Sequence, residues 1–128
     1  MRKRRMRDRI GAPATILGPG ARLRGTLEGA GPFLVAGAVT GDADIEGALT
    51  LADGGRWTGT IHADDVILAG EFDGELLARG RIEILATARV RGRVVGHGIA
   101  ISEGAVVEAE LQSMGEAGVV RFDERRQG

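Results

Sequence analysis

The sequence predicts an all-β fold: a single-stranded, right-handed parallel β-helix (solenoid) of about six rungs with short disordered tails. Short runs of alternating apolar residues recur every 15 to 18 residues, which sets the length of a rung. Glycine accounts for 22 of the 128 residues and aromatic residues for only 3%, as expected for a chain with many turns and a slim core. No stretch shows apolar residues at helical spacing over three turns without an intervening glycine.

The repeat is clearest in the segment Arg81–Val94, where Ile82 and Ile84 form one alternating run and Val90–Val94 forms a second run after a turn. Successive side chains of a strand point to opposite faces, so the apolar residues share one face and the charged residues between them point away. The central glycine of the second run, Gly92, predicts that the interior is too narrow there for a side chain.

Both runs recur in step along the chain. The first runs lie at Thr15/Leu17, Phe33/Val35, Leu49/Leu51, Val66/Leu68, Ile82/Ile84 and Ile99/Ile101. The second runs are Leu23–Leu27, Val39–Ala43, Trp57–Ile61, Phe72–Leu76, Val90–Val94 and Val107–Leu111, the last with Ala109 in the glycine position. Much of the length variation lies in the turn between the two runs, where a loop can lose residues without disturbing the strands.

A rung of this length is too short for a hairpin with its connections, but it suits one turn of a solenoid whose equivalent residues stack in parallel at ~4.8 Å. The inward columns would then be apolar, and each fully buried side chain contributes roughly 1.5–3 kcal/mol. Outward charges would alternate in the columns Asp73/Arg91/Glu108 and Glu75/Arg93/Glu110, which supports the register. Right-handed crossovers are the default for parallel strands, and the hexapeptide-like segment Ile16–Ala21 continues into no left-handed six-residue period.

Three regions are expected: a basic disordered head at residues 1–13, the solenoid at residues 14–112 and a mixed-charge tail at residues 113–128. The net charge of −1 gives the body no general attraction to nucleic acid, which is not an expected partner. Cysteine, a run of 18 apolar residues and a signal-like segment are all absent from the sequence. The expected location is the cytoplasm, with peripheral contact at the inner face of the cell membrane as an addition.

The glycine-centred runs, the segment Arg81–Val94 and the turn Ser102–Val106 resemble those of bactofilins, the polymer-forming cytoskeletal proteins of bacteria. The resemblance covers nearly all of the solenoid. It implies a right-handed β-helix that polymerises end to end without nucleotide, and a scaffold for cell-wall enzymes or other cell-shape machinery. Two positions depart from the family pattern. Val107 stands where members often carry a phenylalanine important for the end-to-end contact, and the head is basic where many members carry a hydrophobic membrane-targeting peptide.

The candidate self-association site is formed by the unpaired edges of the two terminal rungs, because the sequence has no obvious capping helix. The residues expected to take part are Val106, Val107, Leu111 and Phe122 at the C-terminal end and Leu17 and Leu23 at the N-terminal end. Alternatively, Val119, Val120 and Phe122 fold back as a seventh partial rung that caps the solenoid, and the protein is a monomeric adaptor.

The head contains six basic residues, Arg2, Lys3, Arg4, Arg5, Arg7 and Arg9. They would attract anionic lipid or nucleic acid, and the attraction to lipid is worth about 1 kcal/mol per charge near the surface. The alternative is a solvated tail that keeps filaments apart.

We expect no catalytic, cofactor-binding or metal-binding residue and no small-molecule substrate. His62 and His97 lie three and five residues after their central glycines, so they do not stack into a zinc site. An acyltransferase of the hexapeptide type, with one histidine as the base, is the remaining enzymatic alternative. The carboxylates at strand ends, where aspartate favours turns, are Asp42, Asp44, Asp64 and Asp65.

Overall fold

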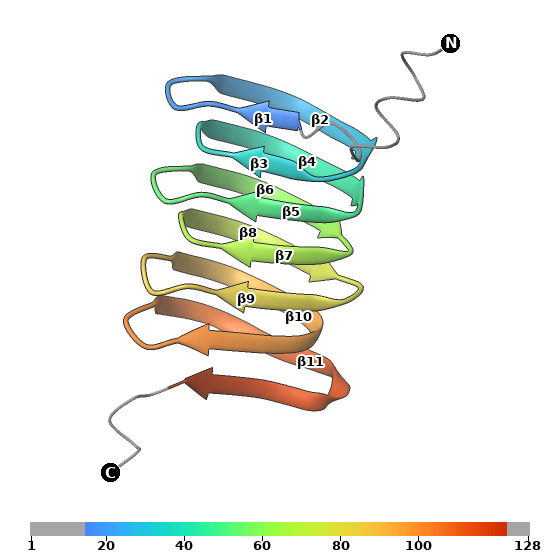
Figure 1. Cartoon of the computed structure of the whole chain (residues 1–128), viewed down its shortest axis with the longest axis vertical. Helices are drawn as coiled ribbons and strands as arrows, with labels where there is room; N and C mark the ends of the chain where they lie inside the picture. The colour runs from blue at the N-terminus through green and yellow to red at the C-terminus, as the bar shows by residue number, and fades with distance from the viewer. Residues whose placement is uncertain (1–14, 123–128) are drawn as a thin grey trace, which may run out of the picture.

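The computed structural model describes residues 15–122, with side chains described for residues 15–114. This part of the chain contains eleven strands and no helix (Figure 1). The strands are β1 (Thr15–Leu17), β2 (Arg22–Ala30), β3 (Phe33–Val35), β4 (Ala38–Glu46), β5 (Ala48–Leu51), β6 (Arg56–Ala63), β7 (Asp65–Leu68), β8 (Glu71–Ala78), β9 (Arg81–Ile84), β10 (Arg89–Ser102) and β11 (Val106–Phe122).

The strands stack into a solenoid of about six turns, as predicted. The short strands β1, β3, β5, β7 and β9 form one face, and β2, β4, β6 and β8 form the opposite face. The long strand β10 continues both faces, because its first half pairs with β8 and its second half with β9. In Figure 1 the front strands run to the left and the rear strands return to the right as the chain descends, so the coil is right-handed.

The predicted register is confirmed throughout the stack. Trp57 is paired in register with Val39 on one side and with Phe72 on the other, and Val90 follows Phe72. The side chains of Trp57 and Phe72 are at most 1% exposed, so the predicted inward column is the core. The indole N–H of Trp57 donates to the carbonyl oxygen of Gly41 at 3.2 Å, which satisfies the one polar atom of that ring.

The central glycines have a different role from the one we predicted. They are half-exposed or exposed rather than enclosed in a narrow interior. From Gly25 to Gly92 their φ angles lie between +106° and +147°, a range that L-residues rarely adopt. A Cβ at Gly74 would overlap the carbonyl oxygen of Gly59 one rung before, and a Cβ at Gly92 would likewise overlap the carbonyl oxygen of Gly74. The missing side chain therefore makes room along the solenoid axis, between rungs, and not toward the core.

Two of the predicted charge contacts form on the β6, β8 and β10 face. Arg91 Nε lies 3.5 Å from Glu108 Oε1, and Arg93 Nη1 lies 3.6 Å from Glu75 Oε2. These side chains are about half exposed or more, so each pair contributes about 0–1 kcal/mol. The charges therefore agree with the register, whereas the apolar columns hold it.

The corner after β6 is held by an ionic clamp that the sequence did not predict. Arg79 Nε donates to Asp64 Oδ1 at 2.5 Å, and Arg79 Nη2 donates to the carbonyl oxygen of Ile45 at 3.0 Å. The backbone N–H of Gly47 donates to Asp64 Oδ2 at 2.8 Å. One arginine thus connects three successive rungs. Its hydrogen bond to the carboxylate lowers the pKa of Asp64, with the backbone N–H of Gly47 acting in the same direction.

Gly74→Ala should lower the free energy of unfolding more than Gly25→Ala. Both glycines have a positive φ, which costs an L-residue about 1–3 kcal/mol. A Cβ at Gly25, however, would meet no described atom within 4 Å, because β2 is on the first rung of the described solenoid. The difference between the two variants in the free energy of unfolding, measured with urea, isolates the steric clash between rungs. Equal losses would mean that the stacking of glycine on glycine imposes no steric requirement.

Asp64→Asn should lower the melting temperature at neutral pH. It should also reduce the fall of the melting temperature as the pH is lowered. The folded pKa of Asp64 is below its unfolded value of about 3.9, so the stabilisation is complete above that value and is lost as the pH falls through the folded pKa. The measurement is thermal unfolding by circular dichroism between neutral pH and about pH 2. Asp73→Asn is the matched control, since within residues 15–114 we find no ion pair for Asp73. Identical acid profiles for the two variants would remove the clamp from the account of stability.

Candidate self-association interface

The N-terminal end of the solenoid exposes the outer edges of two strands. Among the described residues, β1 pairs only with β3 and β2 only with β4. Leu17 and Leu23, both predicted to take part in self-association, lie on this rung and are half-buried against the core. Among residues 15–122 no further rung covers their outer sides, so this part of the chain leaves apolar surface and backbone hydrogen-bonding groups uncovered together.

The C-terminal end is formed by β11, which pairs within the described chain only with β10. Val107 and Leu111 extend the inward columns of Val90 and Val94 and are half-buried. Val106 is in register with Arg89 and is 46% exposed on the outward side. The structure therefore places Val107 and Leu111 at the end of the core and Val106 on the lateral surface, beside the column of Arg56, Glu71 and Arg89.

Strand β11 extends beyond residue 112, where we expected the solenoid to end. Four residues, 114–117, interrupt the register opposite His97, and the chain then pairs again as Gly118–Phe122 along Gly98–Ser102. This return is the seventh partial rung considered above as an alternative. It covers the outer edge of the second half of β10 and leaves the outer edge of Val106–Ser113 open.

The partial rung continues the backbone register of the second half of β10. Val119 is in register with Ile99, but Arg121 is in register with Ile101, at the end of a column formed by Val35, Leu51, Leu68, Ile84 and Ile101. Phe122 is in register with Ser102. Among the described side chains of β11, Val107, Ala109 and Leu111 are the apolar ones that pack against the core.

The site residues predicted from the sequence form two groups at opposite ends of the coil (Figure 1), so only a contact between two molecules can bring them together. Sequence reasoning missed Leu27 and Ala109, which are half-buried on the same terminal strands. Leu27 could have been found, because it occupies the N-terminal position of the column that ends at Leu111.

The remaining candidates contribute no further geometry. The six basic head residues lie outside the described residues. His62 and His97 are both exposed, on different strands and at different register positions. Within residues 15–122 we find no group of three or more His, Cys, Asp or Glu side chains that could hold a metal ion, and no helix suited to cross a membrane.

Comparison with known protein families gives one match. A family model described as bactofilin, polymer-forming cytoskeletal, matches residues 15–112, which is most of the solenoid. No curated protein and no solved structure matches the chain.

Proposed function

The chain belongs to the bactofilin family of polymer-forming cytoskeletal proteins, and from this premise we propose that it assembles end to end, without nucleotide, into filaments that scaffold cell-shape or cell-wall machinery. The filaments would lie in the cytoplasm, and their partners would be further copies of the chain and cell-wall enzymes. The observation that carries the proposal is the structure of the two ends. There, half-buried leucine and valine side chains lie on strand edges that have no partner among the described residues.

The energetic argument follows from the construction of the core. Side chains in the middle of each inward column are covered from both sides, whereas Leu23, Leu27, Val107 and Leu111 are covered from one side only. A second solenoid stacked on either end would bury the remaining apolar surface at about 25 cal/mol per Å². It would also pair the open backbone edge, which monomeric solenoids normally protect with a cap. No bound nucleotide is required for either contribution.

Val107→Arg should remove or strongly weaken filament formation. Loss of a buried valine contact is worth roughly 1.5–3 kcal/mol, and about 1.4 kcal/mol corresponds to a tenfold change in affinity. We therefore expect the critical concentration to rise at least about tenfold, measured by sedimentation and negative-stain electron microscopy. Thr58→Arg, which adds the same charge to the lateral surface of β6, is the control and should assemble normally. Circular dichroism should show the same β-rich spectrum for both variants, and filaments that persist in Val107→Arg would exclude this end from the contact.

The N-terminal end can be tested with the smallest change. Gly25 lies on the first rung, and a Cβ there would meet no described atom within 4 Å. Gly25→Ala therefore adds a methyl group where a second molecule would stack. Reduced assembly of Gly25→Ala beyond any loss of folded protein would place this end in the contact. Full assembly would mean that the contact at this end does not involve the position of Gly25.

A monomeric adaptor is the second candidate, and the pairing of Gly118–Phe122 with β10 is the observation that favours it. A variant truncated after residue 115 distinguishes the monomeric adaptor from the filament-forming protein. If the partial rung is a cap, the full chain should be monomeric in size-exclusion chromatography and the shortened chain should associate through the uncovered Ile99 and Ile101 edge. Filaments of the full chain would exclude the adaptor.

Weak contact with an anionic membrane is a further part of the proposal, carried by the charge of the head alone. Wild type should sediment with vesicles that contain anionic lipid, and a variant lacking residues 2–9 should not, because six cations at about 1 kcal/mol each are removed. Binding should weaken with added salt. Equal sedimentation of the two proteins would leave the head as a solvated tail.

A further inference from the structure

The C-terminal end of the coil is covered by its own chain on one face only. The partial rung, Gly118–Phe122, pairs with the second half of β10 and is the lowest strand in Figure 1. On this half of β10, Ile99 and Ile101 are 2% and 4% exposed. The equivalent positions of the N-terminal rung, Thr15 and Leu17, have no such cover among the described residues and are exposed and half-buried, respectively. The partial rung therefore covers two column ends of a kind that the N-terminal rung leaves open.

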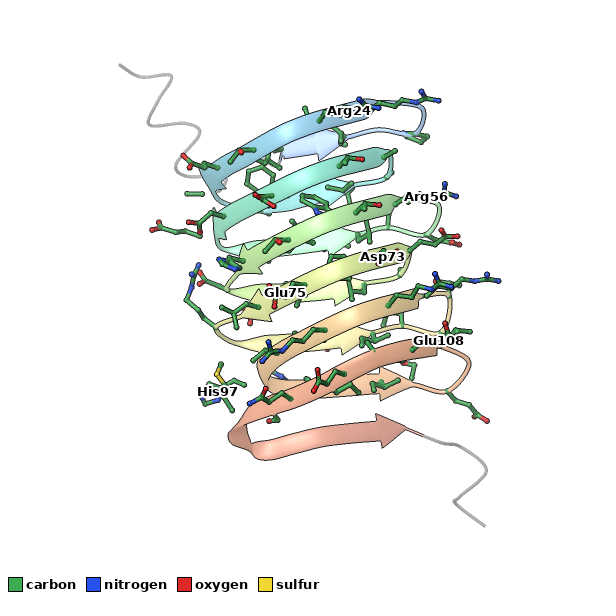
Figure 2. The ribbon with its side chains drawn as sticks, turned by 180° about the vertical axis from the view of Figure 1, so that it is seen from behind. Arg24, Arg56, Asp73, Glu75, His97 and Glu108 are labelled. Atoms are coloured by element: carbon green, nitrogen blue, oxygen red, sulfur yellow. The ribbon has the colours of Figure 1, made fainter. Side chains whose placement is uncertain are left out.

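The partial rung is attached to the solenoid by a short pairing. Five of its residues pair with β10, after residues 114–117 have interrupted the register opposite His97. Figure 2 shows His97 at this corner and Glu108 on the half of β11 that precedes the interruption. Short strands at the edge of a sheet, with few contacts of their own, open at a lower free energy than the core strands. Local release of the partial rung is therefore expected to precede unfolding of the solenoid.

The register also gives the partial rung an arginine at a position where the solenoid is otherwise apolar. Arg121 is in register with Ile101. The column that leads to this position consists of Leu17, Val35, Leu51, Leu68, Ile84 and Ile101. A charged group that leaves water without a partner costs free energy, whereas an aliphatic side chain gains free energy from burial. Arginine is therefore expected to hold the partial rung less firmly than leucine would at this position.

Release of the partial rung would make the two ends of the coil alike. The N-terminal end has half-buried leucines on both faces, Leu17 on one and Leu23 on the other. The C-terminal end has half-buried Val107 on one face, and release would uncover Ile99 and Ile101 on the other. A second molecule that covers this end would then bury apolar columns on both faces and pair with the freed edge of β10.

We propose that the partial rung is an autoinhibitory contact: it occupies the edge of β10 that end-to-end assembly uses, and the C-terminal end associates only while the partial rung is released. This inference rests on the proposed function and adds its regulation. An apparent affinity is reduced by the fraction of molecules that are in the competent state, so the stability of the partial rung sets the concentration at which filaments form. A change that holds the partial rung in place suppresses assembly, and a change that releases it promotes assembly.

Arg121→Leu should raise the critical concentration for filament formation about tenfold, because a leucine continues the apolar column and holds the partial rung in place. The measurement is sedimentation over a range of protein concentrations. Arg121→Lys keeps a positive charge at this position and is the control, with the critical concentration of wild type. An unchanged or lower critical concentration for Arg121→Leu would mean that a second molecule binds over the docked partial rung, which overturns the inference.

Hydrogen exchange below the critical concentration measures the release itself. The amides of the partial rung should exchange at least about tenfold faster than those of β9, which has a paired neighbour on both sides. Equal protection of the two strands would mean that the partial rung opens only when the whole solenoid unfolds, and this result would overturn the inference.

A disulfide that locks the partial rung tests its effect on assembly. Ala100 and Val120 are in register on the two strands, and the chain contains no cysteine. The ~4.8 Å between neighbouring strands lies within the Cα separation that a disulfide accepts, about 4.4–6.8 Å. Ala100→Cys combined with Val120→Cys should therefore form no filaments in negative-stain electron microscopy when oxidised, and reduction should restore them. Thr58→Cys combined with Asp73→Cys, in register on β6 and β8, is the control and should assemble in both states.

The locked variant separates failure of this inference from failure of the proposed function. Filaments of the 100/120 variant only after reduction support the autoinhibitory contact. Filaments in both states would overturn it and leave end-to-end assembly in place. If neither variant forms filaments in either state, the proposed end-to-end assembly fails, and its regulation by the partial rung fails with it.

Discussion

Each rung of this solenoid lies directly over the previous one, because the backbone hydrogen bonds and the apolar columns are both made between equivalent residues of neighbouring rungs. The pairing of Trp57 with Val39 and Phe72 shows the consequence for the core. The stacked glycines show the consequence for the backbone, since a side chain at Gly74 would occupy the position of a carbonyl oxygen one rung away. A slip of one residue would bring charges into the core and a Cβ against the backbone at the same time.

The same stacking explains why the two ends of the described solenoid differ from its middle. A rung in the middle is complete because it has a neighbour on both sides, and the terminal rungs lack one. The two ends are not equivalent in this chain. Within the described strands the N-terminal end has no further partner on either face, whereas the return of the chain at Gly118–Phe122 pairs with one face of the C-terminal end and brings Arg121 into register with Ile101. The described side chains of β11 that pack against the core are Val107, Ala109 and Leu111.

Stacking also turns each outward position of the repeat into a row. On one face the rows carry charges that pair between rungs, as Arg93 does with Glu75. On the other face the row from Ile16 to Ile67 is uncharged over four rungs, and the row from Ala36 to Ala69 is uncharged over three. A single exposed isoleucine on a globular protein would carry little information. A straight row of such residues arises because equivalent positions stack, so its chemistry is a property of the solenoid and not of one rung.

The sequence by itself determined the rung, the register and the inward columns, because these depend on a period of two along a strand and on a repeat of 15 to 18 residues, both of which are visible in the order of residues. It also carried the family assignment. Only the tertiary structure decided the rest. The role of the central glycines depends on where a Cβ points relative to the neighbouring rung, and the Asp64–Arg79 clamp joins side chains from different rungs. The return of β11 follows a break in the repeat at residues 114–117, so periodicity could not extend the register past that point. Local pattern sets which residues stack, whereas the contacts at corners and ends depend on distances in space that the repeat does not encode.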